Sequence, residues 1–158
     1  MQIVDTYCKI KQCFPGGRFD KCSWKKYAQE ISPYIINKVE NDVKNYDYEK
    51  DILPILQSLI QNEDKFTLAH NSFVNVTNNL SDKISEKLGI ELNVFIIFYL
   101  GLCNGAGWAT TLGENSTVLL GVEKIVELSW YDKRNMIALI YHELGHIWHF
   151  QVRKKTYI

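Results

Sequence analysis

The sequence predicts an α+β fold in which an N-terminal layer of helices packs on a small, mostly antiparallel sheet, followed by one buried helix. Three observations predict it. Between residues 24 and 88, apolar residues recur every three or four positions, the period of amphipathic helices. A nearly continuous apolar run at 92–98 and two shorter runs around Gly113 then indicate strands. Finally, residues 136–141 are apolar on every side of a helix, which indicates burial.

Length and composition limit the class of protein. With 158 residues, 46% of them hydrophobic, the chain can bury one core, so we expect one domain at 1–158, either complete or the N-terminal part of a longer protein. Eighteen basic and 18 acidic residues cancel, which predicts neither a nucleic-acid nor a membrane partner. No signal peptide or membrane-spanning run is evident, and the four cysteines form no CxxC pair. These features favour a cytoplasmic protein.

The N-terminal half should be helical after a short lead. Ile3, Val4, Tyr7 and Ile10 are candidate strand positions, and Pro15-Gly16-Gly17 predicts a turn. One long amphipathic helix should follow from Trp24 to Tyr46, capped by Ser23 and kinked at Pro33. A second helix is expected at 52–59, and a third at 66–88 that ends at Gly89 in a left-handed conformation.

The C-terminal part changes period. The run 92–98 predicts a strand buried on both faces, and 108–112 and 117–120 predict a hairpin that turns at 113–115. Ser129 and Asp132, three residues apart, predict the start of a final helix that continues to at least Val152.

That final helix contains the motif with the clearest chemistry, His142-Glu143-Leu144-Gly145-His146. Residues four apart share one helix face, so both imidazoles can reach one zinc ion. Glu143, about 100° around the helix, would act as general base, taking a proton from a metal-activated water during peptide-bond hydrolysis. Because imidazole pairs also suit other divalent metals, zinc is inferred from ligand type. The alternative is a pair of core histidines with hydrogen-bond partners.

Neighbouring residues are weaker candidates. Gly145 in mid-helix suggests that another group approaches the helix closely there. His149 lies about 10 Å beyond His142 along the axis, too far for one zinc to take all three histidines easily. His70 is interpreted as a surface or capping residue. Cys8, Cys13 and Cys22 are spaced too irregularly to predict a second metal site.

From Gly101 onward, the predicted strand, hairpin and HExxH helix resemble the zinc-binding half of zincin metallopeptidases. The stretches 107–111, 118–123 and 142–146 are most similar to bacterial families of predicted zinc-dependent proteases, although only HExxH is a specific match. The resemblance implies a Zn²⁺ cofactor bound by His142 and His146, with Glu143 as base. It also implies that a peptide or protein substrate pairs with an edge strand formed by Trp108, Ala109, Thr110 and Thr111.

One departure from that family leaves alternatives open. Zincins take a third ligand from downstream of the second histidine, but residues 147–158 contain no acidic side chain and only His149 is available. Either the chain is a fragment, which we favour, or the third ligand comes from upstream or from another subunit, or the site is degenerate. The function is accordingly a zinc-dependent peptidase or, alternatively, a peptide- or protein-binding module with a structural or empty metal site. A third alternative is an interaction domain whose helical layer docks a partner.

Overall fold

A four-stranded mixed sheet forms the centre of the computed structural model, which describes residues 1–156, with side chains up to 153. Its strands are β1 (Gln2–Asp5), β2 (Phe95–Tyr99), β3 (Gly107–Leu112) and β4 (Asn115–Gly121), in the order β1-β2-β4-β3. β1 pairs with β2 and β2 with β4 in parallel, and only β3 and β4 are antiparallel. The α+β class is confirmed. The expectation of a mostly antiparallel sheet was wrong, because β2 pairs in parallel both with β1 from the N-terminal lead and with β4.

Eight α-helices surround this sheet within the described part of the chain. In order they are α1 (Tyr7–Ile10), α2 (Lys21–Ile31), α3 (Ile35–Asp42), α4 (Leu53–Gln61), α5 (Glu63–Thr77), α6 (Leu80–Leu88), α7 (Val122–Glu127) and α8 (Lys133–Thr156). A π-helical turn, Tyr48–Ile52, precedes α4. None of the helices in this described part is long and apolar enough to cross a membrane.

Two predicted long helices are each divided in two. The first is interrupted at 32–34, where Pro33 has no N–H to donate, so α2 and α3 are separate helices instead of one kinked helix. The cap of α2 is Asp20, whose carboxylate accepts the Ser23 N–H at 2.6 Å; Ser23 was predicted to have this role. The second break follows Thr77, where Asn79 adopts a left-handed φ of 54°. Gly89 ends α6 with a φ of 64°, as predicted.

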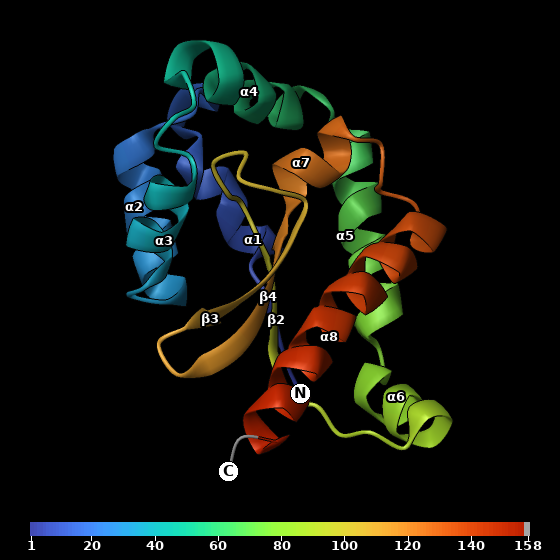
Figure 1. Cartoon of the computed structure of the whole chain (residues 1–158). Helices are drawn as coiled ribbons and strands as arrows, with labels where there is room; N and C mark the ends of the chain where they lie inside the picture. Colours follow the sequence, from blue (N-terminus) through green and yellow to red (C-terminus); the bar gives the residue numbers. More distant parts are fainter. Residues whose placement is uncertain (157–158) are drawn as a thin grey trace.

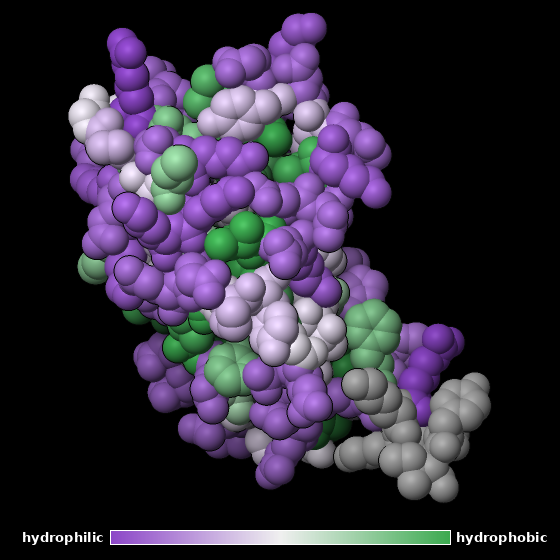
Figure 2. Space-filling view, turned by 90° about the vertical axis from the view of Figure 1, so that its left-hand side faces the viewer, coloured by the Kyte–Doolittle hydropathy of each residue, from purple (hydrophilic) through white to green (hydrophobic). Residues whose placement is uncertain are grey.

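The helices cover both faces of the sheet and do not form a single layer. In Figure 1, α2 and α3 lie on one side of the strands, whereas α5 and α8 lie on the other. On the α2 side, the Trp24 indole N–H donates to the Leu100 carbonyl at 2.9 Å, and the Tyr27 and Thr6 hydroxyls lie 2.7 Å apart. Figure 2, which faces the α2 and α3 side, shows a mostly hydrophilic surface with small, separate apolar patches. These two helices therefore turn their apolar faces towards the sheet.

The final helix is buried along one side only, in contrast to the prediction that its first half is buried all round. It begins after Asp132, whose carboxylate accepts the N–H groups of Arg134 and Asn135. One side of α8 is buried against the sheet and α5 by Met136, Leu139, Ile140, Glu143, Leu144 and Ile147. The opposite side is open, with Ile137 and Tyr141 about 40% exposed (40% and 38%). Apolar composition thus indicated burial of residues that the fold leaves at the surface.

Candidate metal and peptide site

The two motif histidines converge on the open side of α8. His142 and His146 are one helical turn apart, both are exposed, and their Nε2 atoms lie 3.1 Å apart. The ring centroids are 4.7 Å apart and the ring planes are nearly perpendicular, at 86°. Their exposure removes the alternative of two histidines satisfied within the core. The two nitrogens lie within hydrogen-bonding distance of each other, so each ring has the other as its partner.

This separation fits shared coordination of one metal ion. Two nitrogen atoms at zinc-ligand distances of about 2.0–2.1 Å, at a tetrahedral angle, would stand about 3.3 Å apart. The observed 3.1 Å is close to that value. The donor set, two imidazole nitrogens, suits zinc and also other late divalent metals. His142 and His146 could therefore hold a metal as two of its ligands.

A third protein ligand is missing from the part of the chain described. No group of three or more His, Cys, Asp or Glu side chains there could hold a metal ion. His149 is exposed and makes a ring contact with Phe150, at a centroid distance of 6.3 Å. Cys8, Cys13 and Cys22 likewise do not form a group that could hold a metal ion. An upstream ligand, one of the alternatives left open by the sequence, is thus not found among these residues.

Glu143 is directed to the sheet and not to solvent. Its side chain is buried, and Oε2 accepts the backbone N–H of Ala109 in β3 at 2.9 Å. The contact joins the middle of α8 to the middle of β3, two elements that pack directly against each other. This hydrogen bond fixes the orientation of the carboxylate. The residue predicted to be the general base is therefore held by the very strand predicted to bind substrate.

Gly107 makes the approach of Glu143 to β3 sterically feasible. A Cβ at this position would lie 2.7 Å from Glu143 Oε1, 2.9 Å from its Cγ and 2.7 Å from Leu139 Cδ1. Gly145 behaves differently, because a Cβ there would meet nothing within 4 Å. The expectation of a close approach at Gly145 was wrong for the described structure, and the close approach involves Gly107 in its place.

β3 lies at an edge of the sheet, beside β4, and contains the four residues for which the zincin resemblance implied substrate pairing. Ala106, just before β3, accepts the N–H of Gly121 at 3.0 Å, so its main chain faces β4. The backbone N–H and C=O groups of successive residues point alternately to one side of a strand and to the other. The main-chain groups of Gly107, Ala109 and Thr111 therefore point away from β4, along the free edge. The Trp108 side chain of β3 contacts α3, because the Lys38 Nζ lies over its ring, 5.5 Å from the centroid.

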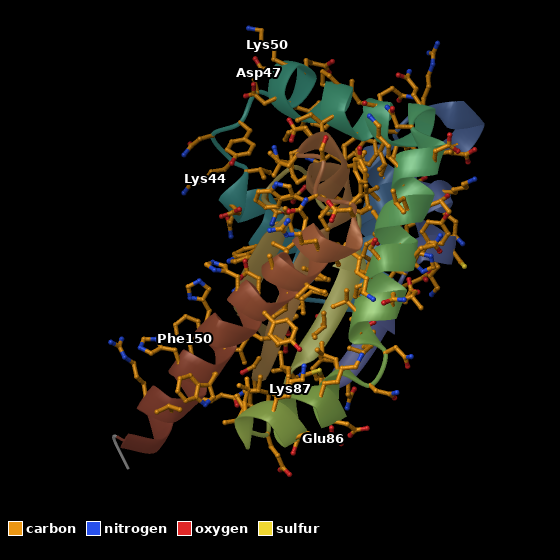
Figure 3. All side chains as sticks on the ribbon, turned by 90° about the vertical axis from the view of Figure 1, so that its right-hand side faces the viewer. Lys44, Asp47, Lys50, Glu86, Lys87 and Phe150 are labelled. Atoms are coloured by element: carbon orange, nitrogen blue, oxygen red, sulfur yellow. The ribbon has the colours of Figure 1, made fainter. Side chains whose placement is uncertain are left out.

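Two hollows border α8 on either side of the Glu143 contact. The first, about 400 Å³, is lined by Trp130, Asn135, Ala138, Leu139 and His142. The second, about 270 Å³, is lined by Thr110, Thr111, Ser116, Ile147, Phe150, Gln151 and Arg153. Figure 3 places Phe150 on the side of α8 away from α5. A larger hollow of about 760 Å³ adjoins the second one, because Ser116 and Gln151 line both; it lies between α6 and the β3–β4 turn, and neither histidine lines it.

A second buried carboxylate was missed by the sequence interpretation. Glu123 is 1% exposed, and its two oxygens accept the N–H groups of Gly101 and Cys103, each at 3.0 Å. Burial raises the pKa of this carboxyl to about 7, although the hydrogen bonds oppose that rise. Glu123 thereby fixes the loop between β2 and β3. The available signal was an acidic residue directly after the apolar run 118–122.

Comparison with known proteins adds no relative: no family model, curated protein or solved structure matches this chain. Functional inference therefore depends on the geometry of the histidine pair, Glu143 and the β3 edge.

Proposed function

We propose that the chain is a zinc-dependent peptidase of the zincin type, with His142 and His146 as metal ligands and Glu143 as general base. The observation that carries the proposal is the 3.1 Å separation of the two Nε2 atoms on the helix that also carries Glu143. When bound, zinc would supply Lewis-acid polarisation of a carbonyl and lower the pKa of water. We assign the compartment as cytoplasmic, from the composition and cysteine usage given above.

The remaining roles belong to residues of this chain. The free edge of β3 offers main-chain groups at Gly107, Ala109 and Thr111, which could hold an extended peptide by strand addition. Glu143 adjoins that edge, and under this proposal its carboxylate would accept a proton near a bound peptide and return it to the leaving amine. The two hollows beside α8 offer room for substrate side chains on either side of Glu143.

Cleavage of unstructured synthetic peptides, read by mass spectrometry with and without zinc, tests this proposal. We expect zinc-dependent products that disappear in Glu143→Gln, because an amide cannot accept the proton. Glu114→Gln, in the exposed β3–β4 turn, is the matched control and should cleave normally. Cleavage that survives Glu143→Gln unchanged would exclude the proposed mechanism.

A second candidate is a peptide-binding module without catalysis. It is favoured by the bond between Glu143 and Ala109, and by the absence of a third metal ligand among the described residues. Under this alternative, peptide binding would persist in chelator and in His142→Ala, with no cleavage product. Loss of binding in both conditions would favour the metal-dependent function.

A further inference from the structure

The bond between Glu143 and Ala109 occupies a position that strand addition needs. Three residues of β3 present main-chain groups along its free edge, and Ala109 is the central one. A peptide that pairs with this edge must place a carbonyl oxygen on the Ala109 N–H. That donor is already taken, at 2.9 Å, by Glu143 Oε2.

Both α8 and β3 favour the contact between Glu143 and Ala109. Glu143 is buried on α8, and Oε1 and Cγ fill the space that a side chain at Gly107 would need. A carboxylate accepting an N–H forms a stronger bond than a neutral acceptor. Hence the free edge of β3 is closed at its centre and open at Thr111, whose N–H faces the same way.

We propose that Glu143 is a latch on the β3 edge, which an extended peptide must displace in order to pair with Ala109. Peptide binding and release of the Glu143 carboxylate are then one event. The competition itself requires no metal and no catalysis. Its consequence, that the base becomes free only when a peptide is seated, rests on the proposed peptidase function.

Amide hydrogen exchange on the metal-free chain, measured by NMR, tests the closed latch. Exchange at Ala109 should be slower than at Thr111, which shares the free edge without the carboxylate. In Glu143→Ala the Ala109 rate should rise to that of Thr111, whereas the β4-facing amides of Trp108 and Thr110 keep their rates. Glu143→Gln retains a neutral acceptor and should give an intermediate rate. An Ala109 rate unchanged in both variants overturns the proposal.

Peptide binding tests the competition. The probe is a blocked six-residue peptide of alternating threonine and valine, titrated to millimolar concentration in the presence of chelator. We expect Glu143→Ala to bind it about tenfold more tightly than the native chain, equivalent to about 1.4 kcal/mol, with shifts at the Ala109 and Thr111 amides. Glu114→Ala removes the same charge from the hairpin turn and should bind like the native chain. If Glu143→Ala binds the peptide with the same affinity as the native chain, or if no variant binds it, the proposal is overturned. Neither readout uses zinc or cleavage, so failure of the peptidase proposal would be seen separately.

Discussion

The Nε2 atoms of His142 and His146 lie 3.1 Å apart on the exposed side of α8. They form a hydrogen bond to each other there, and the same separation lets both coordinate one cation. We therefore expect about one zinc per purified chain by elemental mass spectrometry, and loss of that zinc in His142→Ala. Zinc should also raise the melting temperature of the native chain, because a ligand that binds only the folded state stabilises it.

His149→Ala is the control for the metal prediction. This residue is exposed on the same helix but lies two turns beyond His142, so its loss should leave the zinc content unchanged. Equal loss in His142→Ala and His149→Ala would contradict the assigned pair. Absence of metal after incubation with zinc would exclude it.

Two glycine-to-alanine substitutions should have opposite effects on stability. A Cβ at Gly107 would lie 2.7 Å from both Glu143 Oε1 and Leu139 Cδ1, so Gly107→Ala should lower the free energy of unfolding by about 1–3 kcal/mol. Gly145 has open space around it and lies within a helix, so Gly145→Ala should raise that free energy by about 1 kcal/mol. Urea unfolding of the two variants measures both. A destabilising Gly145→Ala would mean that something does approach α8 there.

Local patterns in the sequence predicted elements well, but not how distant segments pair. The hairpin was predicted from the turn residues 113–115 between two short runs, and the φ of 61° at Gly113 confirms the turn. The helix that carries the motif was predicted from its start at Ser129 and Asp132 and from the apolar stretch that follows. The pairing of β1 with β2 joins residues more than 90 positions apart, at Ile3 and Ile96 among others, and no local signal specifies it. Because neither this pairing nor the parallel pairing of β2 with β4 is specified by a local signal, the sheet was predicted to be mostly antiparallel.

The site shows the same division between local and distant information. The spacing of His142 and His146 predicted their convergence, because it depends only on helix geometry. The bond from Ala109 to Glu143 depends on how α8 packs on β3, which spacing does not encode. Glu123 was missed for the same reason, since its partners Gly101 and Cys103 lie in a loop 20 or more residues away.

Two of the four thiols should react readily with an alkylating reagent, and the other two should be protected. Cys8 and Cys22 are exposed, whereas Cys13 and Cys103 are buried. Burial raises the pKa of Cys13 to about 12 and also raises the pKa of Cys103 well above its usual value. Because the thiolate is the nucleophile, iodoacetamide at pH 8 should label Cys8 and Cys22 at least about 100-fold faster. Peptide mapping reads the sites. Labelling in urea is the control, where all four should react alike, and rapid native labelling of Cys13 would contradict its burial.

Glu123 should make stability depend on pH between about 5 and 8. Its folded pKa, about 7, lies above its usual value of 4.5 because burial disfavours the charge. The folded chain then holds the proton more tightly than the unfolded chain, so this contribution to stability is complete below pH 4.5. It is lost as the pH rises through about 7, with a total on the order of 3 kcal/mol. Glu123→Gln stays neutral and cannot show this loss.

Urea unfolding at pH 5, 6, 7 and 8 measures the effect as a difference between the native chain and Glu123→Gln. The free energy of unfolding of the native chain should fall relative to that of Glu123→Gln as the pH rises. Because the other titratable groups are common to both chains, their contributions cancel in this difference. Glu127→Gln, on the exposed side of α7, is the control and should track the native chain at every pH. Parallel curves for the native chain and Glu123→Gln would mean that the N–H groups of Gly101 and Cys103 offset the cost of burial completely. The carboxylate would then hold the β2–β3 loop equally well across this range.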